Sequence, residues 1–231
     1  FKARVRAKLN AAAGELRFAP DGEAVVAYAL NAATLVAVDP RTGDVRAVPT
    51  PAALNPLNVA PLSGGRVGVW VSRTGTFALI DLRSGTAAGT LPMPEFPPAN
   101  PRLAPAAVAV SADGRFVAAG LRAAGKANPD TKKFEHPPAP VRVADTQTGK
   151  NVVEAEWAGG PGPAGLAFAA DGSRVLLIDP TLRGRWFKLP GGEPDGEWQF
   201  PPAPDAGARL FATSRDGRLA LATGALNGRP G

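Results

Sequence analysis

The chain has no cysteine, only one histidine, and no apolar run long enough to span a membrane. Without cysteine, disulfide frameworks and thiolate metal sites are excluded. The single histidine, His136, has no second histidine or cysteine to share a zinc ion, and no nucleophile–base–orienter set can be assembled around it. No stretch of 18 apolar residues is present, so the sequence predicts no membrane span in this chain.

Positive charge is not spread over the sequence. The formal net charge is +6, and the first ten residues supply four of these charges, from Lys2, Arg4, Arg6 and Lys8. A nucleic-acid-binding domain more often carries a basic face across its fold. We therefore do not expect nucleic acid as a partner. Basic and apolar residues alternate in Lys2–Leu9, which predicts an outermost strand whose charges protect a sheet edge.

Glycine and proline are abundant, with 27 and 25 residues, and they separate short apolar runs throughout. This punctuation favours many strands joined by turns over long helices. One unit recurs: an apolar run, an Asp-Gly pair and a second apolar run, which predicts a β-hairpin with a type I′ turn and glycine in the left-handed region. The copies are Leu16–Ala27, Val108–Ala119, Leu166–Leu177 and Phe211–Ala222, with the turn glycines Gly22, Gly114, Gly172 and Gly217, and a degenerate copy at Asn58–Val71.

A second hairpin follows each of the first three. It is an apolar strand that ends in Asp-x-x-(Thr/Ser)-Gly, and its copies are Leu35–Val48, Phe77–Leu91 and Val141–Trp157. The aspartate can accept a hydrogen bond from the backbone two residues on, and the glycine takes the left-handed position. In the fourth unit, Arg185–Phe200 fills the same place with different turn residues.

Each repeat therefore has four strands, A to D, and turn-to-turn spacings of 43 to 58 residues. Four-stranded propeller blades have about 40–45 residues plus loop insertions. The predicted fold is all-β: a single β-propeller of four-stranded antiparallel blades, with about four complete blades and partial blades at both ends. The complete blades are 15–50, 57–92, 106–157 and 164–200; residues 1–10 give a last strand only and 208–231 the first two strands only. A fragment of a six- to eight-bladed parent is favoured over a closed five-bladed ring.

These hairpins resemble the divergent bacterial WD40-like and YVTN-type β-propeller repeat families, over nearly the whole chain. The strict WD40 signature is absent, since no tryptophan is followed by aspartate and there is no Gly-His dipeptide. The resemblance implies a non-catalytic WD40-like propeller that serves as a protein- or peptide-binding scaffold. The alternative is an enzyme or ligand-binding propeller, lactonase-like or quinoprotein-like, whose site lies in blades missing from this chain.

Strand A lines the central channel of a propeller, and an enzyme of this fold would place acids, bases or metal ligands there. The corresponding segments contain one ionisable residue, Arg17. We therefore predict no catalytic residue, cofactor or metal site in this chain. The segments are Leu16–Phe18, Val108–Val110, Leu166–Phe168 and Phe211–Thr213.

An insertion in the third repeat, Leu121–Pro140, lies between strands B and C. Binding residues often lie on loops held by a rigid scaffold, although surface insertions are also tolerated without a role. The insertion is mildly basic, which suits an acidic protein partner. The candidate partner-binding residues are Lys126, Lys132, Lys133, Phe134 and His136.

Two other patterns have a structural explanation that we favour. The basic and aromatic stretch Arg183–Lys188 could stack on single-stranded nucleic acid, but its alternation fits strand packing. Aspartates recur at the turns, which might suggest calcium loops, yet turn chemistry alone requires them there. These aspartates are Asp21, Asp39, Asp81, Asp113, Asp145, Asp171 and Asp216.

Overall fold

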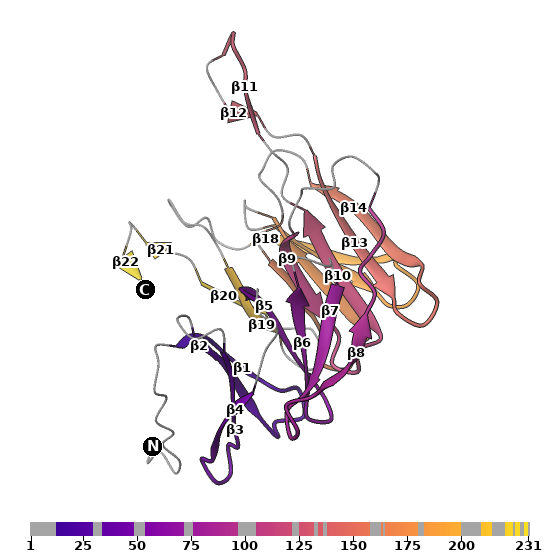
Figure 1. The fold of residues 1–231 in the computed structure, drawn as a ribbon. Helices are drawn as coiled ribbons and strands as arrows, with labels where there is room; N and C mark the ends of the chain where they lie inside the picture. Colours follow the sequence, from indigo (N-terminus) through magenta and orange to yellow (C-terminus); the bar gives the residue numbers. More distant parts are fainter. Residues whose placement is uncertain are drawn as a thin grey trace. The chain divides into compact units, whose positions relative to one another are not determined.

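The computed structural model describes residues 13–29, 34–48, 54–71, 76–96, 105–121, 125–131, 134–135, 138–157, 163, 165–179, 183–199, 209–213, 220–223, 225–226 and 229–230. Every regular element within these ranges is a β-strand (Figure 1). The chain divides into two compact units. Unit 1 comprises Phe1–Pro92 and Ala112–Gly114, and unit 2 comprises Met93–Ser111 and Arg115–Gly231. The predicted strand Lys2–Leu9 lies outside the described residues.

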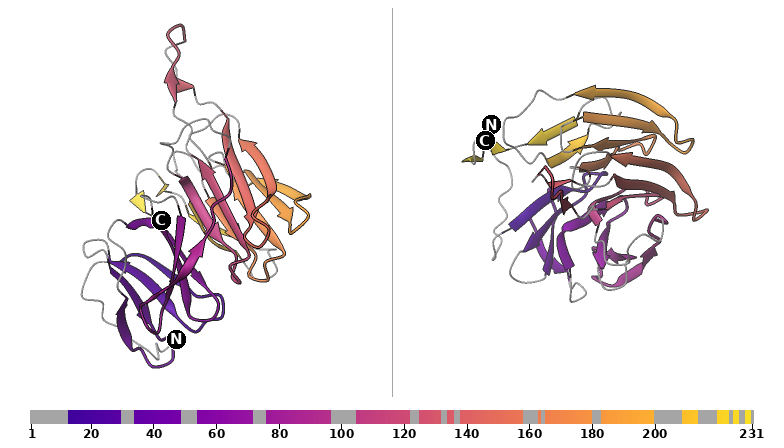
Figure 2. Two further views of the ribbon diagram at one scale, coloured as in Figure 1. Left: turned by 45° about the vertical axis from the view of Figure 1, so that its right-hand side comes forward. Right: turned by 90° about the horizontal axis from the view of Figure 1, so that it is seen from above.

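Unit 1 contains two four-stranded antiparallel sheets, which we call blades 1 and 2 (Figure 2). In both blades the strands pair in the order in which they occur in the chain, so each is a meander. Blade 1 consists of β1 (Ala13–Phe18), β2 (Val25–Ala29), β3 (Thr34–Val38) and β4 (Val45–Val48). Blade 2 consists of β5 (Leu54–Leu62), β6 (Arg66–Val71), β7 (Thr76–Asp81) and β8 (Ala87–Leu91).

The core of unit 1 lies between these two blades. Alternate residues of a strand point to one face, and in β7 the buried Ile80 lies on the face that packs in this core. Leu35 of β3 is fully buried, so replacing it by alanine should cost about 2–5 kcal/mol. The buried side chains that pack together are Val26, Leu35, Val48, Val59, Val67, Val69, Ile80 and Leu82.

Unit 2 contains blades 3 and 4 and three shorter pairs of strands. The first strands of blades 3 and 4 lie side by side, and β19 follows beside the first strand of blade 4. Blade 3 consists of β9 (Pro105–Val110), β10 (Phe116–Leu121), β13 (Ala139–Asp145) and β14 (Asn151–Trp157), and blade 4 of β15 (Gly165–Phe168), β16 (Arg174–Ile178), β17 (Arg183–Lys188) and β18 (Pro194–Gln199). The short pairs are β11 (Lys126–Ala127) with β12 (Phe134–Glu135), β19 (Arg209–Thr213) with β20 (Ala220–Thr223), and β21 (Ala225–Leu226) with β22 (Arg229–Pro230).

The core of unit 2 likewise lies between its two blades. Phe116 of β10 and Phe187 of β17 belong to one buried cluster, which joins the second strand of blade 3 to the third strand of blade 4. The other buried members are Ala109, Ala118, Val141, Val143, Val153, Leu166, Val175 and Leu177. The prediction of an all-β fold made of four-stranded antiparallel blades is thus confirmed.

The hairpin between strands A and B forms where the Asp-Gly pair predicts it, but its turn differs from the prediction. In blade 1 the Gly22 amide donates to the Ala19 carbonyl (2.9 Å), and the Ala19 amide donates to the Ala24 carbonyl (2.8 Å). Four residues therefore separate the paired positions, and the predicted two-residue type I′ turn is wrong. Blade 4 forms the same turn with Ala170 in place of Pro20, and in both blades the aspartate carboxylate accepts the amide two residues on, from Glu23 (3.0 Å) and from Ser173 (2.9 Å).

The turn glycines nevertheless adopt the predicted left-handed conformation. Gly22, Gly114 and Gly172 have φ angles of 72°, 80° and 71°. Gly217 lies outside the described residues.

The hairpin between strands C and D follows the predicted aspartate chemistry. The Asp39 carboxylate accepts hydrogen bonds from the backbone amides of Arg41 (2.7 Å) and Thr42 (3.3 Å), and Gly43 has a φ of 81°. Asp81 and Asp145 accept the same pair of amide hydrogen bonds in blades 2 and 3. In all four blades the turn glycine also donates its amide to the backbone carbonyl four residues earlier, as Gly192 does to Lys188 (2.8 Å), and in blade 4 this bond is made without an aspartate.

Candidate functional site

The A–B turn and the C–D turn of a blade lie at the same end, and in blades 2, 3 and 4 they are hydrogen-bonded to each other. The residue that follows the last residue of strand C donates its backbone amide to the A–B turn. The three bonds are Leu82 to the Gly65 carbonyl, Thr146 to the Arg115 carbonyl and Leu189 to the Ser173 carbonyl, each 2.8 Å long. We call this end of each blade its turn end.

The opposite end of a blade holds the B–C loop and the link to the next blade. In unit 2, Gly120 near the end of β10 packs against Pro163 of the link between blades 3 and 4. The contact is so close that a Cβ atom on Gly120 would lie 2.2 Å from Pro163 Cγ. The insertion of blade 3 therefore leaves the sheet beside this link.

The insertion carries the residues predicted to bind a partner, and part of it forms a separate hairpin, β11–β12. Lys126 pairs with Glu135, and Ala127 pairs with Phe134, through the backbone. The Lys126 side chain is exposed. Lys132, Lys133 and His136, along with the position of the Phe134 side chain, lie outside what the structure describes.

Asn128 holds the tip of this hairpin. Its side-chain oxygen accepts hydrogen bonds from the backbone amides of Asp130 (2.9 Å) and Thr131 (3.2 Å). Its side-chain nitrogen donates to Glu135 Oε1 (2.7 Å). The insertion thus has a turn that its own hydrogen bonds stabilise, and Figure 1 shows the hairpin extending beyond the sheet of blade 3.

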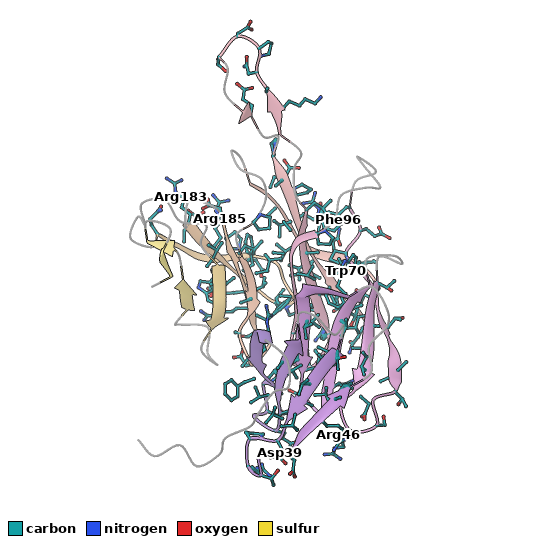
Figure 3. All side chains as sticks on the ribbon, turned by 60° about the vertical axis from the view of Figure 1, so that its left-hand side comes forward. Asp39, Arg46, Trp70, Phe96, Arg183 and Arg185 are labelled. Carbon is teal, nitrogen blue, oxygen red and sulfur yellow. The ribbon has the colours of Figure 1, made fainter. Side chains whose placement is uncertain are left out.

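The basic and aromatic stretch of β17 is part of blade 4's packing. Trp186 and Phe187 are 7 % and 8 % exposed, so neither ring offers a face on which a base could stack. Arg185 projects beside Arg183 (Figure 3) and pairs with Glu197 of the neighbouring strand, with Nε and Oε1 2.6 Å apart. This finding agrees with the structural interpretation of the stretch.

The turn aspartates act on their own turns. Hydrogen bonds from the backbone amide and hydroxyl of Ser84 hold the pKa of Asp81 below its ordinary value. The hydroxyl and amide of Ser173 likewise lower the pKa of Asp171. Among the described residues, no three histidine, cysteine, aspartate or glutamate side chains gather as a metal site would require.

Asp145 is the most buried of the turn aspartates that the structure describes, with 3 % of its surface exposed. Burial acts to raise the pKa of Asp145, but the amides of Gln147 and Thr148 and the guanidinium of Arg115 outweigh it, so the pKa is lowered. Arg115 donates from both Nε (3.2 Å) and Nη2 (3.1 Å) to Asp145 Oδ2. In blade 3 this ion pair adds to the hydrogen bonds that the amide (2.8 Å) and the hydroxyl (2.9 Å) of Thr146 donate to the Arg115 carbonyl, so three contacts hold the two turns together.

A feature that the sequence did not reveal is a cleft at the turn end of unit 1. It has a volume of about 440 Å³, and three arginines and three carboxylates line it. Arg46 of β4 reaches from blade 1 to blade 2, where its Nη1 atom donates to the carbonyls of Leu82 (3.3 Å) and Arg83. The lining residues are Glu23, Ala24, Ala37, Val38, Asp39, Arg41, Asp44, Val45, Arg46, Gly65, Leu82 and Arg83.

Arg17, the ionisable residue predicted on a channel-lining strand, lies in β1 and is partly buried. In the described ranges, no helix is long and apolar enough to cross a membrane.

Comparison with known proteins supports the architecture. No family model matches the chain, and no curated protein matches its sequence. A solved structure of hydrazine synthase from Kuenenia stuttgartiensis is similar, with a TM-score of 0.57 and 14 % identity, over 97 % of this chain and 59 % of that one. The β-propeller domain of Cps50 (Swd1) from Myceliophteria thermophila is also similar, with a TM-score of 0.58 and 14 % identity, over 95 % of this chain and 82 % of that one. At this level of identity the similarity concerns the fold, and the chain is a β-propeller of four-stranded blades.

Proposed function

We propose that this chain is a non-catalytic WD40-like propeller that serves as a protein- or peptide-binding scaffold. The observation that carries the proposal is the hairpin β11–β12, an insertion that no other described blade has at the corresponding place. The blades supply a rigid frame, and residues that bind partners are commonly displayed on loops of such a frame.

The hairpin has the properties of a contact surface. Its backbone is paired and its tip is held by Asn128, so little conformational entropy is lost when a partner binds it. Lys126 is exposed on it, and Lys132 and Lys133 follow in its loop. Clustered lysines raise the rate of association with an acidic surface. The proposed partner is therefore a protein with an acidic docking surface.

Replacing the hairpin tests the proposal. The replaced segment must end before Ala139, because that residue is fully buried in β13. A variant with Lys126–Glu135 replaced by a Gly-Ser linker keeps the blade intact. Partners are captured with the wild-type chain from its native extract, identified by mass spectrometry, purified and titrated against both proteins.

We expect the linker variant to bind the purified partner at least about tenfold more weakly, a loss of about 1.4 kcal/mol. Its melting temperature should stay close to that of the wild type, because loop length contributes little to stability. The variant Lys150→Gln, at an exposed C–D turn of blade 3, serves as the matched control for a lost lysine. Equal affinities of the linker variant and the wild type would refute the proposed role of the hairpin.

A further inference from the structure

At the cleft of unit 1, blade 1 lacks a hydrogen bond that the other three blades have. In blades 2, 3 and 4 the residue after strand C donates its amide to the A–B turn, as Thr146 does in blade 3. Blade 1 is aligned with the others by its turn aspartate, Asp39. The residue after this aspartate is Pro40, which has no N–H group. The carbonyl of Glu23 therefore receives no hydrogen bond from that position, and both turns of blade 1 border the cleft.

The cleft is also left open on the side of blade 2. In unit 2 the C–D turn of blade 4 presses against the last strand of blade 3, since a Cβ atom on Gly192 would lie 1.9 Å from the Val152 carbonyl oxygen. Arg46 occupies in blade 1 the position that Val152 has in blade 3, counted from the turn aspartate. Its long side chain spans the distance that the backbone closes in unit 2.

The unused hydrogen-bonding capacity of the cleft is mainly that of donors. Arg41 and Arg83 are exposed and have no carboxylate within ion-pair distance in the described part of the chain, although the positive charge of Arg83 helps to lower the pKa of Asp81. Each guanidinium carries five N–H donors. Asp39 already accepts two backbone amides, and Asp44 accepts the Thr42 hydroxyl (2.8 Å). Glu23 is the remaining carboxylate of the lining.

The cleft also has an aliphatic floor. Val38 and Leu82 are buried at its base, and Ala24 and Ala37 are partly buried beside them. Val45 is 44 % exposed, one of the few large apolar side chains in the described ranges that face solvent. A ligand that covers this floor removes apolar surface from water, which a small free anion cannot do.

We propose that this cleft binds a short acidic peptide segment of a partner protein. An aliphatic side chain of the segment covers Val45 and Leu82, and carboxylates of the segment pair with Arg41 and Arg83. A carboxylate matches the planar fork of a guanidinium and accepts two parallel hydrogen bonds from it. The site is separate from the hairpin β11–β12 and needs no contribution from it.

Selection from a library of short random peptides tests the assignment. The full-length chain is immobilised, and enriched peptides are synthesised with a fluorescein label and titrated by fluorescence anisotropy. We expect the enriched peptides to contain aspartate or glutamate near an aliphatic residue. Loss of both guanidinium forks in the variant Arg41→Gln/Arg83→Gln should weaken binding at least about tenfold.

Two further variants test whether the charge of the cleft controls peptide binding and whether the effect is confined to the cleft. Glu23→Gln removes a like charge from the cleft and should strengthen binding of the same peptide. Lys150→Gln removes an exposed cation from the C–D turn of blade 3 and should leave the affinity unchanged. Circular dichroism checks that each variant keeps the strand content of the wild type.

The proposal is overturned if the selection yields no binding peptide, if the enriched peptides carry no acidic residue, or if the double arginine variant binds as tightly as the wild type. Inorganic phosphate and free glutamate are added as competitors. Displacement of the peptide by either at a similar concentration would show a simple anion site and would also overturn the assignment to a peptide.

Discussion

Blades 1 and 2 of unit 1 and blades 3 and 4 of unit 2 share the same strand order and the same turn motifs, yet their turn ends are joined differently. In unit 2 the backbone of one blade touches the next at Gly192 and Val152. In unit 1 two side chains join the turn ends, since Arg46 donates to the carbonyls of Leu82 and Arg83 and Asp21 accepts the Gly64 amide (2.8 Å), and a cleft remains. Two positions of blade 1 differ from their equivalents, because Pro40 cannot donate a hydrogen bond and Arg46 stands where blade 3 has Val152. Within one repeat architecture, single positions at the turns thus decide whether adjacent blades close or leave a site.

The largest loss of stability is expected from a substitution that breaks the contact between Gly192 of blade 4 and Val152 of blade 3. Gly192→Ala places a methyl group against the Val152 carbonyl and strains a backbone with φ of +80°. We expect a loss of about 3 kcal/mol or more in the free energy of unfolding. Gly149→Ala is the matched control, since Gly149 has the same turn position, a φ of +71° and nothing within 4 Å of its Cβ direction. It should cost about 1–2 kcal/mol. Equal denaturation midpoints would show that the contact between blades 3 and 4 is not tight.

The next effect compares two aspartates with the same turn role. Asp145→Ala leaves the partly buried amide hydrogen bonds of its turn and Arg115 without their partner, and we expect a cost of about 3 kcal/mol. Asp39→Ala, in the open blade 1, removes only hydrogen bonds at an exposed turn and should cost about 1 kcal/mol. Urea denaturation of both variants measures the difference. If Asp39→Ala costs as much as Asp145→Ala, the ion pair to Arg115 adds nothing.

Acid should remove the stability that Asp145 contributes to the closed turns of blade 3. The pKa of Asp145 is lowered in the folded state, so the unfolded chain takes up this proton at a higher pH than the folded chain does. The stability that Asp145 contributes is therefore complete above about pH 4, the ordinary range of an aspartate, and is lost as the pH falls through the lowered pKa. The free energy of unfolding of Asp145→Asn should fall less steeply with acid than that of the wild type. Parallel curves would contradict this assignment.

The smallest change in stability is expected when the two turns of blade 1 are given the hydrogen bond and the ion pair that join the turns of blade 3. In the double variant Glu23→Arg/Pro40→Thr, the threonine supplies the missing amide and the arginine can pair with Asp39. We expect a gain of about 0.5–1 kcal/mol in stability, because one hydrogen bond and one exposed ion pair contribute little each. Binding of the selected acidic peptide is measured in the single variant Pro40→Thr, where it should weaken because the turn closes without any change in the charge of the cleft. Unchanged stability and unchanged peptide affinity would contradict the role given to Pro40.

Much of the fold follows from local sequence, because hairpins and their turns are set by neighbouring residues. Asp39 and its equivalents close their turns as predicted from the Asp-x-x-(Thr/Ser)-Gly pattern. The turn type of the A–B hairpin was missed, since the Asp-Gly pair was taken as a two-residue turn, whereas the Asp21 carboxylate stabilises a longer one by accepting the Glu23 amide. The insertion in blade 3 was recognised from its length, whereas the tip held by Asn128 was not.

The cleft depends on contacts between residues far apart in the chain, and no local pattern predicts it. Arg46 and the carbonyl of Leu82 are 36 positions apart. A signal was nevertheless present in the repeats. Aligning the C–D turns places Pro40 against Leu82, Thr146 and Leu189, so only this turn lacks an amide donor at that position. Comparison of the repeats with one another, position by position, reveals such a difference.

The most direct test of the binding role is the reactivity of individual lysines with and without the purified partner. Acetylation followed by mass spectrometry reports how accessible each lysine is in the full-length chain. The proposal expects Lys126, Lys132 and Lys133 to be protected when the partner is bound, while Lys150 and Lys188 at the turn ends of blades 3 and 4 keep their reactivity. Protection of Lys150 and Lys188 with no change at the three insertion lysines would contradict it.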